Sequence, residues 1–299
     1  MTDVDAARSP VPVHPALVPD NVAVVTGGAS GIGLAAALRF AQMGLKVAIA
    51  DRPGTALEQA VAEIADAVPG SDVRGFPTDV SDRTAVHALE RDVRGAFGRV
   101  DVLMNNAGIQ PGSSVFDAEG TWGAILGVNL WGVVHGTQIF GPGIIAQGTP
   151  GLIINTGSKQ GITTPPGDPA YNVSKAGVKA FTEALQHELR NTPGCAVSAH
   201  LLIPGFVFTG LTARGRTDKP AGAWTSAQTV DFMLARLAAG DFYILCPDND
   251  VSRAVDERRI LWAAGDIVEN RPPLSRWHEA YGAAFAAFLA AGPGPDRAD

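Results

Sequence analysis

The sequence is poor in cysteine and has no long apolar run. Its 299 residues include only two cysteines, Cys195 and Cys246, which lack the paired Cys/His spacing of a structural zinc site. So few cysteines indicate a reducing compartment. No apolar stretch approaches the roughly 18 residues of a membrane span, and the N-terminus carries acids and prolines instead of a signal peptide's basic end and apolar segment. We therefore expect a cytoplasmic protein.

Excess positive charge is also missing, and the histidines are scattered. The formal net charge is −7 and the sequence pI is near 5.3, which gives no basic footprint for nucleic acid or for an anionic membrane. The six histidines show no metal-ligand spacing. These absences leave small molecules as the expected partners and predict no metal site, no nucleic acid and no membrane contact.

Proline-rich or glycine-rich termini flank one long patterned region. Residues 1–19 hold four prolines and are predicted to form a disordered or loosely packed arm, and residues 291–299 a disordered tail. Residues 20–290 fit one dinucleotide-binding and catalytic domain, which we favour over two smaller domains. Within it, residues 211–225 are rich in Gly, Thr and charge, as is typical of a mobile loop over a substrate site.

Short β-branched runs alternate with helical patterns along this domain. The expected strands are 22–26, 46–50, 73–77, 101–105, 152–156, 197–203 and 242–246. The expected helices are 32–43, 55–67, 82–97, 121–140, 172–190 and 226–239. Strands that are apolar on both faces and separated by helices predict a mostly parallel sheet covered on both sides. The fold class is therefore a doubly wound, Rossmann-type α/β fold of about seven strands.

A glycine-rich turn follows the first expected strand. The stretch "TGGASGIG", residues 26–33, leads directly into a helical pattern. Free N–H groups and the positive end of the dipole at such a helix start can hold a pyrophosphate. Gly27 would then permit the turn, Gly31 the approach of phosphate, and Gly33 the packing of helix on strand. A purely structural βα turn is the alternative for this motif alone.

A second pattern spaces a hydroxyl, a phenol and an ammonium. Ser158 lies 13 residues before Tyr171, and Lys175 lies four residues after it. In a helix that begins near Tyr171, Lys175 lies one turn further along the same face, so both groups can reach one point. A phenol has a pKa of about 10, and a nearby ammonium lowers it toward the range of a usable base. A packed aromatic and a solvated lysine are the alternative for such a pair taken alone.

Further motifs follow in a fixed order. "TDV" occupies 78–80, "NNAG" 105–108 and "PGFVFT" 204–209, and Asn129 lies in "GVNLWG". With T-G-x-x-x-G-x-G and S-x12-Y-x3-K, this series resembles the short-chain dehydrogenase/reductase family from residue 26 to residue 209. After Thr209 the usual family ending is not recognisable.

The resemblance implies an oxidoreductase that moves a hydride between a nicotinamide cofactor and a secondary alcohol or ketone. Tyr171 would transfer the proton, Lys175 would tune Tyr171 and hold the nicotinamide ribose, Ser158 would hold the substrate oxygen, and Asn129 would connect the lysine to solvent through water. The cofactor-binding residues implied are Gly27, Ser30, Gly31, Ile32, Gly33, Asp51, Arg52, Asp79, Val80, Asn106, Ala107, Gly108, Tyr171, Lys175, Pro204, Gly205, Val207 and Thr209.

The end of the second strand indicates which cofactor is used. Asp51 can accept hydrogen bonds from the adenosine ribose hydroxyls of NAD and would repel the 2′-phosphate of NADP. Arg52 is the counter-argument, since it could pair with that phosphate, whereas Ser30 stands where NADP-using relatives often have a basic residue. We expect NAD, with NADP as the alternative.

Several properties stay open at this level. An apolar alcohol, a polyol or sugar, and a hydroxyacyl thioester all fit the motifs, and a non-catalytic redox sensor is the alternative to an enzyme. The family resemblance and the apolar residues 278–289 favour a homodimer or homotetramer. Residues 255–289 are assigned either to an oligomer interface or to the substrate pocket.

Overall fold

The computed structural model describes residues 13–213 and 215–292 and contains one seven-stranded sheet. All neighbouring strands are parallel, in the order β3-β2-β1-β4-β5-β6-β7. The strands are β1 Val22–Thr26, β2 Lys46–Asp51, β3 Val73–Pro77, β4 Val102–Asn105, β5 Gly151–Thr156, β6 Val197–Ile203 and β7 Tyr243–Leu245. The predicted fold class and all seven predicted strands are confirmed, with shifts of one residue at some ends.

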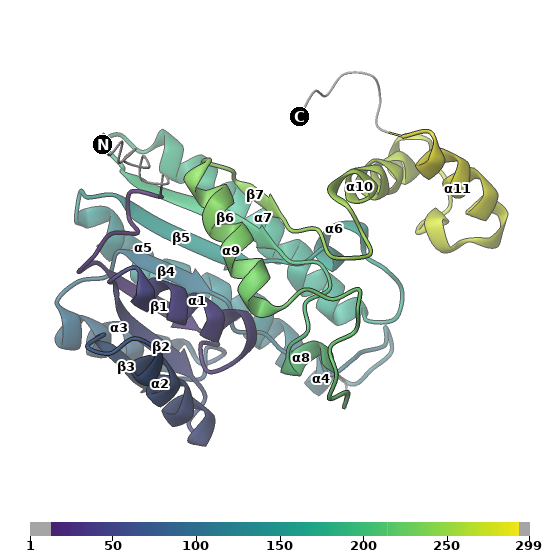
Figure 1. Cartoon of the computed structure of the whole chain (residues 1–299). Helices are drawn as coiled ribbons and strands as arrows, with labels where there is room; N and C mark the ends of the chain where they lie inside the picture. Colours follow the sequence, from purple (N-terminus) through teal and green to yellow (C-terminus); the bar gives the residue numbers. More distant parts are fainter. Residues whose placement is uncertain (1–12, 214, 293–299) are drawn as a thin grey trace, which may run out of the picture.

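Helices cover both faces of this sheet (Figure 1). They are α1 Gly31–Gln42, α2 Thr55–Ala67, α3 Arg83–Phe97, α4 Glu119–Leu126, the π-helix η1 Gly127–Trp131, α5 Gly132–Ala146, α6 Gln160–Thr163, α7 Pro169–Asn191, α8 Gly210–Ala213, α9 Ser226–Ala238, α10 Arg253–Val268, the 3₁₀-helices η2 Ser275–Trp277 and η3 Glu279–Tyr281, and α11 Gly282–Ala290. The helix predicted over 121–140 is in fact α4, η1 and α5 in succession. A π-turn of this kind often marks a functional position.

The core forms two apolar layers, one on each face of the sheet. Ala23 and Val25 of β1 pack with α1, α2 and α9, whereas Val22 and Val24 of the same strand pack with α3, α5 and α7. This alternation follows from the two-residue period of a strand. Each fully buried Val, Leu or Ile contributes roughly 1.5–3 kcal/mol, so the two layers fix the strand ends against one another.

The predicted N-terminal arm differs from expectation where it can be seen. Residues 1–12 lie outside the described residues, but Ala16 and Leu17 are buried, with 0% and 3% of their surface exposed. His14 Nε2 lies 3.0 Å from Ser198 Oγ at the start of β6. This part of the arm is therefore attached to the domain through His14, Ala16 and Leu17. Residues 293–299 of the predicted tail lie outside the described residues.

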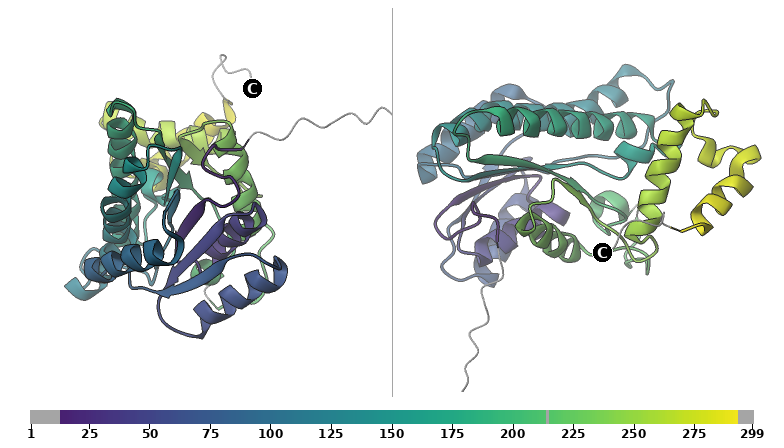
Figure 2. Two further views of the ribbon diagram at one scale, coloured as in Figure 1. Left: turned by 90° about the vertical axis from the view of Figure 1, so that its left-hand side faces the viewer. Right: turned by 90° about the horizontal axis from the view of Figure 1, so that it is seen from above.

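The C-terminal part projects from the body as a helical hairpin (Figures 1 and 2). It holds α10, η2, η3 and α11, with Trp262 of α10 at ring-centroid distances of 5.2 Å from both Phe285 and Phe288 of α11. None of the residues of α11 is buried. Among the described residues, no helix combines the length and apolar character needed to cross a membrane.

Candidate active site

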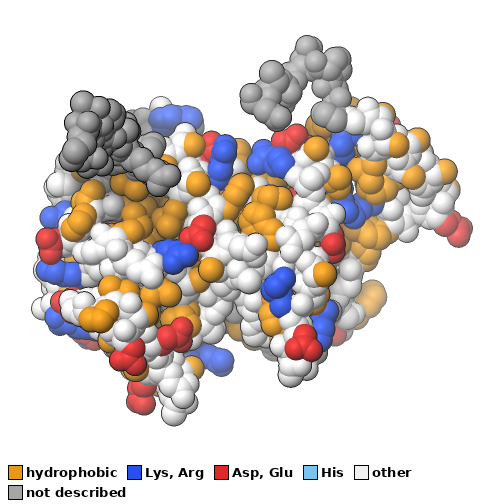
Figure 3. All heavy atoms as spheres, in the orientation of Figure 1, with side chains coloured by type: hydrophobic (Ala, Val, Ile, Leu, Met, Phe, Trp, Pro, Cys, Tyr) orange, Lys and Arg blue, Asp and Glu red, His pale blue; other side chains and the backbone are white. Residues whose placement is uncertain are grey.

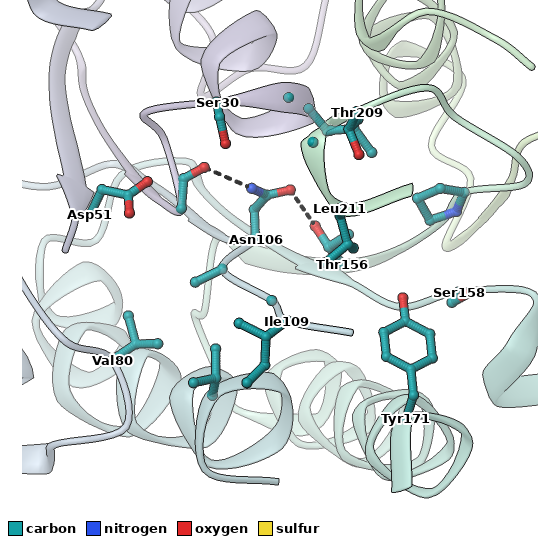
Figure 4. Close-up of a pocket in the computed structure, with 18 of the residues that line it drawn as sticks. Ser30, Asp51, Val80, Asn106, Ile109, Thr156, Ser158, Tyr171, Thr209 and Leu211 are labelled. Atoms are coloured by element: carbon teal, nitrogen blue, oxygen red, sulfur yellow. Dashed lines mark hydrogen bonds between the residues drawn. The ribbon is translucent and has the colours of Figure 1, made fainter. Parts of the chain in front are cut away.

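A cavity of about 520 Å³ opens at the carboxyl ends of the strands. This edge is where open parallel sheets bind ligands. All predicted site residues line the cavity except Gly33 and Asn129 (Figure 4). Leu211, which also lines the cavity, belongs to the predicted loop over residues 211–225. Ile109, Val128 and Thr156 line it too but were not predicted, because no recognised motif assigns a role to them.

Three glycines shape one end of the cavity. Gly27 and Gly31 have φ angles of 64° and 56°, which disfavour any side chain. A Cβ on Gly33 would lie 2.2 Å from the carbonyl oxygen of Gly27, and a Cβ on Gly27 would lie 2.6 Å from the Cα of Ala107. The turn therefore needs glycine where the backbone is closest. Ser30, the N-cap of α1, makes no side-chain capping bond, so the first N–H groups face the cavity without that partner.

The segment after β4 is tied to this turn. The backbone N–H of Asn106 donates to Thr26 Oγ1 at 3.0 Å, and its side-chain Nδ2 donates to the Gly27 carbonyl at 3.2 Å. Thr156 Oγ1 donates to Asn106 Oδ1 at 3.4 Å (Figure 4). The carboxyl ends of β1, β4 and β5 are thus held together by Asn106, which fixes the floor of the cavity.

Acidic groups mark the end of β2. Asp51 Oδ2 accepts the N–H of Ala29 at 2.9 Å, and Asp51 Oδ1 accepts the N–H of Arg52 at 2.8 Å. Asp79 follows β3, the strand beside β2, and lines the same cavity. Hydrogen bonds from Ser81, together with the charge of Arg52, lower the pKa of Asp79. The carboxylate of Asp51 is therefore held at the cavity wall by two backbone N–H groups. The guanidinium of Arg52 lies close enough to Asp79 to stabilise the charged form of its carboxylate.

Tyr171 lies in the first turn of α7, with Ser158 opposite its hydroxyl (Figure 4). Only 7% of Tyr171 is exposed. Burial raises the pKa of Tyr171 to about 12; a hydrogen bond with Ser158 opposes this rise, and the charge of Asp168 adds to it. The expected lowering of the phenol pKa is therefore absent in the protein alone, because desolvation outweighs the neighbouring groups.

Lys175 lies one turn further along α7 and is 4% exposed. Its Nζ donates to the carbonyl of Thr156 at 2.8 Å and lies 5.7 Å from the centre of the Tyr171 ring. Burial lowers the pKa of Lys175 to about 8. The predicted convergence of Tyr171 and Lys175 is present in the geometry, with the ammonium held by the end of β5.

Asn129 sits in η1 and is fully buried. Its Nδ2 donates to the Ile109 carbonyl at 2.9 Å, and its Oδ1 accepts the N–H of Ile109 at 2.8 Å. Nδ2 also lies 3.3 Å from Ser174 Oγ. The amide does not line the cavity; it pairs with the backbone of the segment after β4 and links that segment to α7.

Comparison with known proteins shows the family of this chain. Residues 21–220 match the short chain dehydrogenase family. The chain belongs to the short-chain dehydrogenase/reductase family. It is 38% identical over 195 residues to the 3-oxoacyl-[acyl-carrier-protein] reductase of Thermotoga maritima, covering 65% of this chain and 77% of that protein. It is 32% identical over 250 residues to 1-deoxy-11-beta-hydroxypentalenate dehydrogenase of Streptomyces avermitilis, covering 81% of this chain and 90% of that protein.

Solved structures of this family show the same fold. A short chain dehydrogenase/reductase from Burkholderia phymatum in complex with NAD is 32% identical, with a TM-score of 0.77 over 85% of this chain and 96% of that chain. An alcohol dehydrogenase from Thermococcus sibiricus complexed with 5-hydroxy-NADP is 28% identical, with a TM-score of 0.65 over 73% of this chain and 90% of that chain. This short-chain dehydrogenase/reductase is an NAD(P)-dependent oxidoreductase.

Proposed function

We propose that this short-chain dehydrogenase/reductase oxidises a secondary alcohol or reduces the matching ketone, with Tyr171 as the proton-transfer group and NAD as cofactor. The arrangement of Tyr171, Ser158 and Lys175 in one cavity supports this proposal most directly. When bound, the nicotinamide supplies a carbon that accepts or gives a hydride. Mixing the protein with NAD and a panel of apolar alcohols, polyols and hydroxyacyl thioesters, and following absorbance of the reduced cofactor, tests the reaction and sorts the substrate classes.

Different side chains of the protein then bind the substrate oxygen and transfer its proton. Ser158 holds that oxygen, and Tyr171 takes its proton in oxidation or returns it in reduction. The Lys175 ammonium stabilises the phenolate of Tyr171 and holds ribose hydroxyls. Asn129 holds the backbone of Ile109 through two hydrogen bonds and, as the resemblance implies, joins a water path from Lys175 to solvent.

The shape of the cavity suits a dinucleotide. The glycine turn leaves room where a Cβ would otherwise clash, and the start of α1 offers N–H groups to phosphates. We assign the phosphate, adenine and nicotinamide contacts to Gly27, Ser30, Gly31, Ile32, Asp79, Val80, Asn106, Ala107, Gly108, Pro204, Gly205, Val207 and Thr209. Gly33, which does not line the cavity, supports the site through the close packing of α1 on the Gly27 turn.

The preference for NAD rests on Asp51. Its carboxylate is fixed at the cavity wall by the N–H groups of Ala29 and Arg52, so it cannot easily turn away from a 2′-phosphate. Like charges at this position disfavour NADP. Hydrogen bonds to a charged group contribute roughly 1.5–3 kcal/mol, which corresponds to a preference of about tenfold or more for NAD.

Replacing Asp51 tests this preference. Asp51→Ala is expected to raise the KM for NAD and improve the use of NADP, because Arg52 is then free to pair with the 2′-phosphate. Asp51→Asn is the sharper variant, since its amide oxygen can still accept the N–H of Ala29 while the charge is gone. The measurement is kcat/KM with both cofactors, and Asp72→Ala, which removes an exposed partner of Arg74, is the control. Equal or better efficiency of the unmodified enzyme with NADP would contradict the assignment.

We also propose that the enzyme forms a homodimer or homotetramer. Figure 3 shows hydrophobic side chains at the surface of the projecting C-terminal hairpin. Among the residues of this hairpin, Leu261 is 59% exposed, Ile267 86%, Val268 84% and Trp277 41%. Exposed apolar surface of this kind often marks an interface. Sedimentation at micromolar protein concentration is expected to give an oligomer that Ile267→Lys weakens. A monomer under these conditions would contradict the proposal.

A further inference from the structure

A buried ion cluster lies beside the active-site cavity. Lys159 directly follows Ser158, and its Nζ lies 3.2 Å from Asp248 Oδ2 and 2.5 Å from Asp256 Oδ2. The Lys159 side chain is 17% exposed, and those of Asp248 and Asp256 are 6% exposed each. None of these three residues lines the cavity. The cluster is therefore separate from the groups that meet the substrate or the cofactor.

The cluster joins the carboxyl ends of three neighbouring strands. Lys159 follows β5, Asp248 follows β7, and the segment after β6 passes between them. Here the N–H of Phe206 donates to Asp248 Oδ2 at 3.2 Å, and the N–H of Lys159 donates to the Pro204 carbonyl at 3.3 Å. A Cβ on Gly205 would lie 2.7 Å from both Asp248 Oδ2 and Lys159 Nζ. Because Gly205 has no side chain, the cavity-lining turn at this residue can contact the charged groups of Lys159 and Asp248 directly.

The same lysine supports the helix that carries Tyr171. Lys159 is the N-cap of α6, and the N–H of Gln160 donates to Ser158 Oγ at 3.1 Å. In the next position of α6, a Cβ on Gly161 would lie 2.5 Å from the carbonyl carbon of Lys175. The short helix α6 therefore packs closely against α7 at Lys175, and Lys159 lies between Ser158 and this contact in the chain.

The buried charges explain why the side chain of Lys159 stays between Asp248 and Asp256. Two carboxylates at this depth are costly unless they are paired, and removing one partner of such a pair leaves an uncompensated charge. Arg259 Nη1 is 3.9 Å from Asp256 Oδ1, so Lys159 is the closest cation to Asp256 and also contacts Asp248. Burial raises the pKa of Asp256, and its hydrogen bond with Lys159 opposes that rise.

Asp256 lies in α10, beyond residues 21–220 that match the family. We propose that Lys159 is a positioning residue for the Ser158–Tyr171 pair, and that its ion pairs with Asp248 and Asp256 couple the C-terminal hairpin to catalysis. The inference rests on the proposed function, since it assigns Lys159 a role in the same proton transfer. The hairpin acts through the geometry of Ser158, without touching the substrate.

Lys159→Met tests this coupling because methionine keeps an unbranched chain and removes the charge. The expected result is a fall in kcat of about 10–100-fold, the effect of misplacing a catalytic group by up to about 1 Å. The Kd for NAD, measured by fluorescence titration, should stay within about threefold of wild type. Lys159 does not line the cavity, and the variant keeps both the backbone bond to the Pro204 carbonyl and the bond from the Phe206 N–H to Asp248, which hold the cofactor-contacting turn. Arg253→Met, which removes an exposed ion pair with Glu257 on the same helix α10, is the matched control and should leave kcat unchanged.

Asp256→Asn is a second, independent test, because it removes one carboxylate and leaves Lys159 paired with Asp248. It should also lower kcat, and the Lys159→Met/Asp256→Asn double variant should lose no more than Lys159→Met alone, because the two residues act through one contact. A folded Lys159→Met enzyme with kcat within about twofold of wild type overturns the inference, as do additive losses in the double variant. If Lys159→Met does not fold, an unchanged kcat in Asp256→Asn overturns it.

Tyr171→Phe in the same assay distinguishes failure of the proposed function from failure of the positioning role of Lys159. If Tyr171→Phe keeps full turnover, the proposed function itself is wrong. If Tyr171→Phe loses turnover while Lys159→Met keeps it, the proposed function stands and only the positioning role of Lys159 fails.

Discussion

Tyr171→Phe is expected to lower turnover by at least the roughly 10²–10⁴-fold that acid–base catalysis contributes. The substitution removes the phenolic oxygen and keeps the ring, which is 7% exposed and packs at the start of α7. Cofactor binding should therefore change little. The measurement is kcat under conditions in which chemistry is rate-limiting, together with the Kd for NAD.

Tyr243→Phe is the matched control for this experiment. Tyr243 is 46% exposed, and its hydroxyl is bonded to Glu183 on the surface, so its removal should leave kcat unchanged. A Tyr171→Phe enzyme that keeps more than about a tenth of wild-type turnover would show that another group moves the proton.

The pKa of Tyr171 makes the second prediction specific. Burial raises the pKa of Tyr171 to about 12, so its use as a base near pH 7 requires a group that stabilises the phenolate. Each unit of lowering requires about 1.4 kcal/mol of preference for the phenolate. A cation beside the phenol can supply such a preference, and Lys175 is the cation whose Nζ lies over the Tyr171 ring at 5.7 Å from its centre. The Lys175 pKa of about 8 keeps that group charged at pH 7.

Lys175→Met is accordingly expected to lower kcat/KM by at least about 100-fold, as the loss of one charge-stabilising group at an active site typically does. The direction of the expected pH shift follows from the role of the phenolate. Oxidation needs the deprotonated phenol, so its rate rises as pH passes upward through the pKa of Tyr171. Without the ammonium that pKa is higher, and the residual oxidation activity should shift to more alkaline pH. The Kd for NAD should also rise, because Lys175 is assigned to the ribose.

Lys179→Met, one turn further along α7, removes an exposed lysine paired with Glu183 and is the control. Its pH–rate profile should match that of wild type. If Lys175→Met likewise keeps the wild-type pH–rate profile, Lys175 does not tune Tyr171.

The order of elements and the closeness of Lys175 to Tyr171 could be predicted from the sequence because they depend on local pattern. Apolar runs such as 152–156 and 197–203 are strands because both their faces are buried, and helices between them require a parallel sheet. Tyr171 and Lys175 share a helix face by their spacing alone. The glycine turn predicts a close backbone approach, and the structure shows it at Gly27 and Gly33.

The tertiary structure decided everything that depends on burial or on contacts far apart in the chain. Desolvation raises the pKa of Tyr171, whereas the spacing of its partners predicts a lowering, because spacing says nothing about how much water is excluded. Ala16 and Leu17 pack on the domain despite the flanking prolines. Lys159 and Asp248 are 89 residues apart, and only the alignment of strand ends brings them together. Local pattern fixes which residues share a strand or a helix face, whereas long-range packing sets how deeply they are buried and which distant groups they meet.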